Sequence, residues 1–289
     1  MTGAAFDDTA AAAFCADLVR SHDFPRYAAT IFVPADLRRA LLALYAFNVE
    51  ITRVREQVSQ ALPGEIRLHW WTDMLAGHAH GSAEANPVAA ELMQVIRLGE
   101  LPVDKLSRLI EEHQFDLYND PMPTMAALEG YLNDTSPALF ALAAQIAGGP
   151  TSPEIEHLAR HAGLAQGMVR VVAMLPYDAP RRQLFLPQQV LAQHGSDPEE
   201  VFAGKLTPRV RGAVEHLLAE ARRHFDTAYG LLADVPEQLR PVFLPLAVVR
   251  RDLKRFSRAD SDPFASQPPS RLSTLWSLWR ASRAKQFRG

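Results

Sequence analysis

Cysteine is almost absent from this sequence, which has only Cys15 in 289 residues. A single cysteine excludes an intramolecular disulfide bond and a metal site built from several thiolates. A surplus of charge is missing as well, because 33 acidic residues nearly balance 30 basic ones and the formal net charge is −3. Such a balance gives no overall positive field to attract nucleic acid, so we expect no nucleic-acid partner.

Long apolar runs are also lacking. No stretch approaches the roughly 18–20 consecutive apolar residues that a membrane-spanning helix needs. The N-terminal segment contains Asp7 and Asp8 and has no basic residue before Arg20, which is unlike a secretory signal or an Arg-rich transit peptide. We therefore expect a cytoplasmic protein.

Strand-like alternation is the last missing pattern, since its nearest case, residues 29–33, is too short to build a sheet. Helical periodicity dominates instead: after Pro34, apolar residues recur at intervals of three and four as far as Val49. Further helices are predicted over residues 66–75, 88–98, 103–118, 126–132, 138–147, 155–174, 209–232 and 239–256. The sequence predicts an all-α fold, with a single domain over residues 1–259.

Two segments follow that domain. Residues 260–270 mix Asp, Ser and Pro, which predicts a linker. Residues 271–289 contain basic, Leu and Trp residues and no acidic residue, the composition of a basic amphipathic segment. One interpretation is a helix at a membrane surface, with contacts from Trp276, Trp279, Arg280 and Arg283. The other is an ordinary terminal helix that packs back onto the body.

The helix after Pro34 carries Glu50, Arg53 and Glu56 at intervals of three. Side chains at this spacing meet on a helix surface, so residue types alone favour an exposed ladder of ion pairs. A second acidic set, Glu112, Asp116 and Asp120, recurs every four residues on a predicted helix. That set is either a solvated face or a cation site.

The run Arg-Arg-Ala-Leu-Leu-Ala-Leu-Tyr-Ala-Phe at residues 38–47 resembles the first conserved helix of the squalene/phytoene synthase family. In that family the helix continues into an Asp-Asp-x-x-Asp motif that binds magnesium and a prenyl diphosphate. The three aspartate positions hold Thr52, Arg53 and Glu56 in this sequence. A guanidinium about 4 Å from a cation costs roughly 4 kcal/mol per unit charge at an effective dielectric near 20. We therefore expect no magnesium cluster there.

The second magnesium motif of the family is altered too. Phe185-Leu186-Pro187 resembles the family's Tyr-Leu-Pro segment. Counting back from it places Arg170 on the motif's asparagine, Met174 on its first aspartate and Asp178 on its second. Gln183 falls on the family arginine, beside Arg182. Asp116 matches an aspartate that is common in the family.

A divergent branch of the family, the mitochondrial complex I assembly factors, is similar in the same places. The matching residues are Tyr45–Glu50 (Tyr-Ala-Phe-Asn-Val-Glu), Ala165–Gly167, Pro176-Tyr177 and the Arg181-Arg182 pair. That branch also lacks the aspartate motifs, and the similarity extends from about residue 23 to residue 256.

The resemblance implies an isoprenoid synthase helical fold with a central cavity lined by Tyr45, Phe47, Leu139, Phe140, Met168 and Val172. The candidate ligand-binding residues are Tyr45, Phe47, Asn48, Glu50, Arg53, Glu56, Asp116, Gln166, Arg170, Asp178 and Arg182. We expect no catalytic residue, no metal ligand and no cofactor. His78 and His80 form a weak pair of metal-ligand candidates, for which an exposed loop is the favoured interpretation.

The function that the resemblance implies is a noncatalytic binding or respiratory complex I assembly-type factor. Its expected partners are a prenyl or polyprenyl lipid and a respiratory-complex client, with peripheral contact at the inner face of the cytoplasmic membrane. The alternative is a prenyl transferase that condenses two allylic diphosphates with altered magnesium ligation.

Overall fold

Helices make up the regular structure of this chain. The computed structural model describes residues 8–78, 85–99, 101–148, 152–265 and 267–287. No strand occurs among these residues, and the predicted all-α fold is confirmed. None of the helices in the described ranges is long and apolar enough to cross a membrane.

The α-helices are α1 (Asp8–His22), α2 (Phe24–Thr30), α3 (Ala35–Thr52), α4 (Val54–Gln57), α5 (Ala61–Leu75), α6 (Pro87–Gly99), α7 (Val103–Glu112), α8 (Met125–Asn133), α9 (Ser136–Gly148), α10 (Pro153–Asp178), α11 (Gln188–Gln193), α12 (Pro198–Phe202), α13 (Pro208–Leu231), α14 (Leu246–Phe256) and α15 (Arg271–Ser282). Short 3-10 helices are η2 (Phe115–Leu117), η3 (Ala179–Arg181), η4 (Leu232–Asp234) and η5 (Glu237–Phe243). Residues 29–33, the nearest match to a strand pattern, form the end of α2 and the turn after it.

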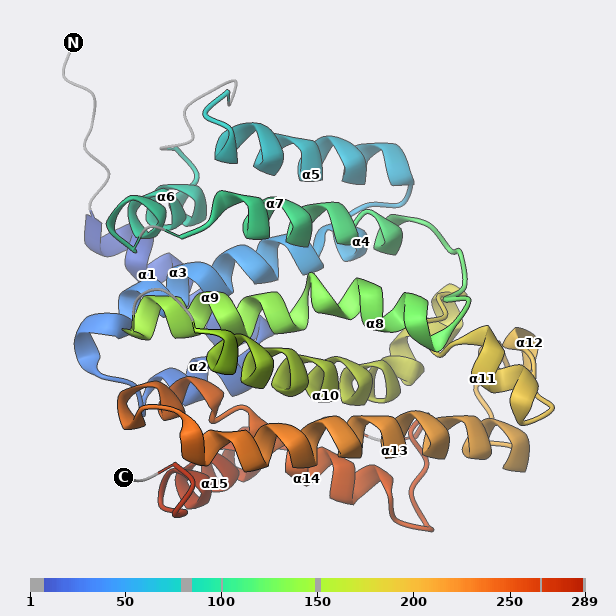
Figure 1. The fold of residues 1–289 in the computed structure, drawn as a ribbon. Coiled ribbons are helices and arrows are strands. Elements are labelled where there is room, and N and C mark those ends of the chain that lie inside the picture. Colours follow the sequence, from blue (N-terminus) through green and yellow to red (C-terminus); the bar gives the residue numbers. More distant parts are fainter. Residues whose placement is uncertain (1–7, 79–84, 100, 149–151, 266, 288–289) are drawn as a thin grey trace.

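The helices lie in layers around α10, the longest of them (Figure 1). Helix α10 packs between α9 and α13, while α1, α3 and α6 pack together near the N-terminus. Helix α5 covers α7, and α14 lies against both α10 and α13. Side chains from most of these helices join one continuous hydrophobic core, so the molecule has a shared interior rather than separate ones.

Local sequence signals explain where the central helices begin. Ser152 and Thr207 accept hydrogen bonds from the backbone N–H groups three residues later, at the starts of α10 and α13. A proline follows each of them in the first helical turn, where its missing N–H costs nothing. Helix α9 begins at Ser136 with Pro137 in its first turn.

The predicted helix over residues 103–118 is shorter in the structure. Helix α7 ends at Glu112. The Nδ1 atom of the next residue, His113, lies 2.7 Å from the Leu109 carbonyl oxygen and gives this oxygen a hydrogen-bond partner at the helix end. Asp116 then lies in η2, and Asp120 lies in the non-helical segment after it. The prediction that Glu112, Asp116 and Asp120 share one helix face is therefore wrong.

Helix α15 lies against α14 and α2. Its inward side chains are Thr274, Leu278 and Ala281, all buried. The segment before it, within residues 257–265 and 267–270, contains no helix. The tail therefore has the packed arrangement in this structure, and its contact with a membrane stays a prediction.

Candidate functional site

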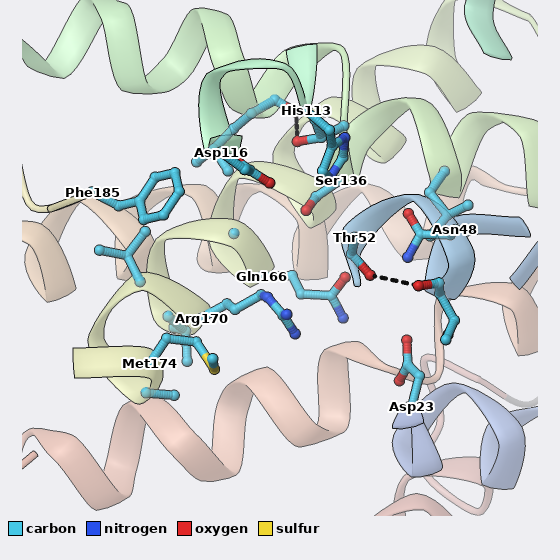
Figure 2. A pocket seen from close by; sticks show the side chains of 18 of the residues that line it. Asp23, Asn48, Thr52, His113, Asp116, Ser136, Gln166, Arg170, Met174 and Phe185 are labelled. Atoms are coloured by element: carbon cyan, nitrogen blue, oxygen red, sulfur yellow. Dashed lines mark hydrogen bonds between the residues drawn. The ribbon is translucent and has the colours of Figure 1, made fainter. Parts of the chain in front are cut away.

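A cavity of about 380 Å³ opens between the helices that the two altered motifs occupy. Its wall is formed by the α1–α2 turn, the α3–α4 junction, η2, the end of α8, the start of α9, α10, η3 with the segment after it, and α14. Figure 2 shows Gln166, Arg170 and Met174 pointing into it from α10, with Asp23, Asn48 and Thr52 on another side. The volume lies within the usual range of ligand pockets, roughly 300–1,000 Å³.

The first motif region meets the cavity where helix α3 gives way to helix α4. Helix α3 ends at Thr52, and Arg53 serves both as its C-cap and as the N-cap of α4. Asn48, Thr52, Arg53 and Glu56 all line the wall. The Arg53 Nε atom is 3.8 Å from Glu56 Oε2, too long for a hydrogen bond, and this buried nitrogen has no hydrogen-bond partner. A buried donor without a partner is costly, and a hydrogen-bond acceptor on a ligand would satisfy it.

The second motif region forms a stripe on α10. Gln166, Arg170, Met174 and Asp178 follow one another at intervals of four, and all of them line the cavity. Gln166 accepts a hydrogen bond from Arg26. Arg170 has no hydrogen bond or ion pair to any described residue, although it lies close enough to Asp178 and Asp116 to influence both electrostatically. The guanidinium of Arg170 is therefore available to an outside ligand.

Two carboxyl groups on the wall are difficult to ionise. Burial raises the pKa of Asp178 to about 7, and Arg170 opposes the rise. Burial also raises the pKa of Asp116, although His113 and a hydrogen bond donated by the Tyr131 hydroxyl, with an O···O distance of 2.9 Å, favour the ionised form. Both groups thus hold protons more readily than exposed carboxyls do.

Sequence reasoning missed several cavity residues. Tyr131 and Phe185 contact each other with ring centroids 5.6 Å apart, and both lie on the wall. Asp23 and Arg26 form an ion pair at the edge of the cavity, with Arg26 Nη1 2.6 Å from Asp23 Oδ2. The Phe-Leu-Pro segment contained a signal for Phe185, but Tyr131 stands in an ordinary apolar helix that gave none.

Some predicted site residues lie elsewhere. Tyr45 and Phe47 are buried and do not line the cavity: Arg26 lies over the Tyr45 ring, and Phe47 packs edge-on against Trp71 with centroids 5.3 Å apart. Glu50 is outside the wall as well, and burial raises its pKa. Arg182 is exposed and paired with Glu199. Phe47 and Glu50 are turned away from the wall by the helical repeat of about 100° per residue. Tyr45 shares a face of α3 with the wall residues, but its ring lies under Arg26. Arg182 follows η3 with a left-handed backbone and is paired with Glu199 outside the cavity.

Only part of the predicted apolar lining lies on the cavity wall. Leu139 lies on the cavity wall, whereas Phe140, Met168 and Val172 are buried behind it. Phe140 stacks on Phe243 with ring centroids 5.6 Å apart. These three side chains support the wall and do not form it.

The residues at the motif positions do not fit magnesium. That ion needs near-octahedral oxygen ligands, but Thr52, Arg53 and Glu56 stand on one side and Arg170, Met174 and Asp178 on the other. Within the described ranges, no group of three or more His, Cys, Asp or Glu residues could hold a metal ion. His78 is exposed, and His80, its predicted companion, lies outside the described residues.

The cavity wall has a basic part and an apolar part. Arg53, Arg170 and Arg181 supply guanidinium groups to its wall. Apolar side chains form another part of the wall, namely those of Leu132, Leu139, Val169, Val248 and Val249. A molecule with a phosphate-like head and a hydrocarbon chain matches both parts.

This chain is similar to a family of enzymes and to an assembly factor. The squalene/phytoene synthase family model matches residues 19–280 of this chain. NADH dehydrogenase (ubiquinone) complex I, assembly factor 6, from Mus musculus is 31% identical over 251 residues, which cover 87% of this chain and 75% of the mouse protein.

Two solved structures share the fold. Squalene synthase HpnC from Alicyclobacillus acidocaldarius has a TM-score of 0.70 at 21% identity, covering 98% of this chain and 96% of its own. A dehydrosqualene synthase in complex with a ligand has a TM-score of 0.77 at 12% identity, covering 95% and 97%. These likenesses confirm the predicted isoprenoid synthase fold.

Proposed function

Because the chain belongs to the squalene/phytoene synthase family, we propose that it is a noncatalytic member that binds an anionic lipid and serves as an assembly-type factor. The observation that carries this proposal is Arg53, which lies in the cavity wall at a position where the resemblance places a magnesium-binding aspartate. A guanidinium pairs with phosphate oxygens directly, so binding needs no divalent cation. We therefore expect neither catalysis nor a cofactor.

The ligand that fits this wall is a prenyl or polyprenyl phosphate. Its head would pair with Arg53, whose buried Nε atom has no hydrogen-bond partner, and with Arg170 on α10. Its hydrocarbon chain would lie along the apolar side chains of Leu139, Val248 and Val249.

The assembly role is supported by the similarity to the mouse protein named complex I assembly factor 6. We propose a respiratory complex as the client. A client of that kind is embedded in a membrane, which would place this protein in the cytoplasm at the inner face of the cytoplasmic membrane.

Ligand binding is tested by titrating the purified protein with farnesyl diphosphate, once in EDTA and once with Mg²⁺. We expect binding under both conditions. Arg170→Ala should weaken it about tenfold or more, because a hydrogen bond to a charged group contributes roughly 1.5–3 kcal/mol. Arg182→Ala is the matched control, since Arg182 is exposed, outside the cavity and paired with Glu199. Binding that requires Mg²⁺ would contradict the proposal.

The assembly role is tested by deleting the gene in its own host. We expect the NADH:quinone oxidoreductase activity of isolated membranes to fall. Re-expression of the parent or of Arg182→Ala should restore this activity, and Arg170→Ala should not. Unchanged respiratory activity together with loss of a carotenoid or hopanoid would instead support a prenyl transferase.

That second candidate function has one observation in its favour, the Asp116 and Asp178 carboxyl groups on the cavity wall. It requires magnesium held by an altered set of ligands. Incubation with labelled farnesyl diphosphate and Mg²⁺ decides between the two: a condensed product that is lost in Asp178→Asn would overturn the noncatalytic proposal.

A further inference from the structure

Helix α15 carries a more apolar stripe on its outer face than on the face that packs against the body. Leu272, Trp276 and Trp279 are 78%, 59% and 39% exposed. Spacings of four and three place these side chains on one face of the helix. The inner face presents the smaller set of Thr274, Leu278 and Ala281 to the core. The outer stripe therefore contributes little to folding.

The two tryptophans form an ordered aromatic surface. Their rings stack with centroids 4.9 Å apart and an angle of 22° between the planes. The Arg283 guanidinium lies 4.3 Å from the Trp279 ring centroid and extends the stripe by one more turn. Indole rings combine an apolar body with a polar N–H, which suits the boundary between membrane and water.

The charge around this stripe has one sign. Arg280, Arg283 and Lys285 are exposed, and none of them has an ion pair with another described residue. Asp262 is the last acidic residue of the sequence, so residues 263–289 contain no acidic side chain. Exposed tryptophans flanked by unpaired cations complement a surface that is apolar below and anionic above.

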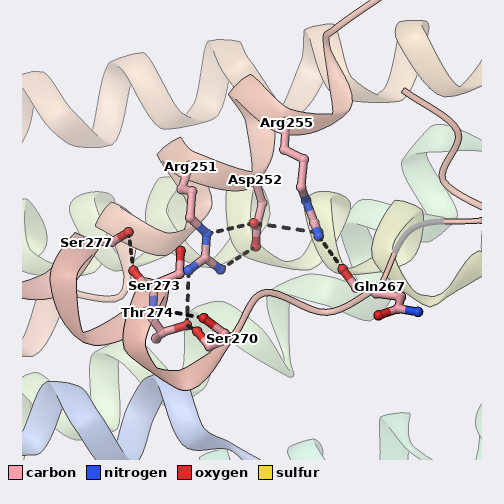
Figure 3. A network of polar contacts seen from close by, with 8 residues as sticks. All are labelled: Arg251, Asp252, Arg255, Gln267, Ser270, Ser273, Thr274 and Ser277. Atoms are coloured by element: carbon pink, nitrogen blue, oxygen red, sulfur yellow. Dashed lines mark hydrogen bonds and ion pairs between the residues drawn. The ribbon is translucent and has the colours of Figure 1, made fainter. Parts of the chain in front are cut away.

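Polar contacts fix α15 beside the cavity. Figure 3 shows Arg251 between Asp252 and the hydroxyl of Thr274: its Nη1 donates to Thr274 Oγ1 at 3.0 Å, and its Nε lies 3.1 Å from Asp252 Oδ1. Arg255 pairs with the same carboxylate at 3.6 Å and donates to the Gln267 carbonyl oxygen at 2.8 Å. Asp252 also lines the cavity. The helix is thus anchored to the element that forms one cavity wall.

We propose that the outer stripe of α15, made of Leu272, Trp276, Trp279 and Arg283 with Arg280 beside it, is a docking surface for a bilayer of anionic lipids. The helix lies along the lipid surface with its apolar rings at the level of the headgroups, and its cations pair with phosphates. Asp252 and Arg251 then hold the cavity next to the bilayer. This docking does not depend on what the cavity binds, so it stands or falls separately from the proposed cavity ligand.

The test measures cosedimentation of the full chain with vesicles of phosphatidylcholine and phosphatidylglycerol, and with vesicles of phosphatidylcholine alone. We expect binding to the anionic vesicles, at least tenfold weaker binding to the neutral ones, and weakening by added salt. Trp276→Ser combined with Trp279→Ser should weaken binding to anionic vesicles at least tenfold. Leu62→Ser combined with Ile66→Ser is the matched control, since both residues are 63% exposed on α5, and it should bind like the parent.

A charge variant gives a second measurement in case the tryptophan variant folds poorly. Arg280→Glu combined with Arg283→Glu should also reduce binding to anionic vesicles at least tenfold. Equal binding by the parent and both variants would overturn the proposal, as would no binding by the parent. Sedimentation velocity without lipid detects a competing occupant: a dimer that the tryptophan substitutions dissociate would make the stripe an interface between copies.

Discussion

Asp178 is only 8% exposed, and burial raises the pKa of its carboxyl group from 3.8 to about 7. The folded state therefore keeps a proton that the unfolded state releases. The stability from this group is complete below about pH 4 and is lost as pH rises through about 7. We expect the free energy of unfolding of Asp178→Asn to equal that of the parent near pH 4. Near pH 8 it should exceed that of the parent by ~2–4 kcal/mol. Urea unfolding at both values measures this, and a difference independent of pH would contradict it.

The sequence located part of the cavity at the level of single residues, for a clear reason. The motif positions of the family identified three cavity residues, Arg53, Arg170 and Asp178. All three line the same cavity. Tyr45 and Phe47 have the same sequence signal, but the Tyr45 ring lies under Arg26 and Phe47 packs against Trp71. A motif specifies neither of these contacts. Tyr131 reaches Asp116 from another helix, and contacts of this kind depend on tertiary packing alone.

The crossing of α9 and α10 depends on Gly163. A Cβ atom at this position would clash with the backbone N and Cα atoms of Pro137, and backbone cannot move aside as a flexible side chain can. We expect Gly163→Ala to lower the free energy of unfolding by ~1–3 kcal/mol or more. Gly130→Ala in α8 is the control, because open space surrounds its Cβ position. Its free energy of unfolding should rise by ~0.4–1 kcal/mol. Equal effects in urea unfolding would show that the helices do not approach closely here.

Whole helices were easier to predict than their ends. Periodicity identified α10 and α13 because a long amphipathic pattern is hard to mistake, and capping residues fixed where they begin. The region after Glu112 failed because periodicity continues to Tyr118 while the His113 side chain satisfies the Leu109 carbonyl group and the chain then turns. A side chain that ends a helix in this way leaves no distinct mark in the sequence.

The whole molecule includes the C-terminal helix in its core. Leu278, Ala281 and Phe287 belong to the same buried cluster as the central helices, and burying a Leu or Phe side chain contributes about 1.5–3 kcal/mol. We therefore expect a chain that ends at Ser270 to lose ~3–6 kcal/mol of unfolding free energy, measured by urea denaturation. Trp276→Ser with Trp279→Ser changes only exposed rings and should unfold like the parent. If the shortened chain instead unfolds at the parent's urea concentration, the tail is an independent segment behind the 260–270 linker, and its docking on α14 does not hold the molecule together.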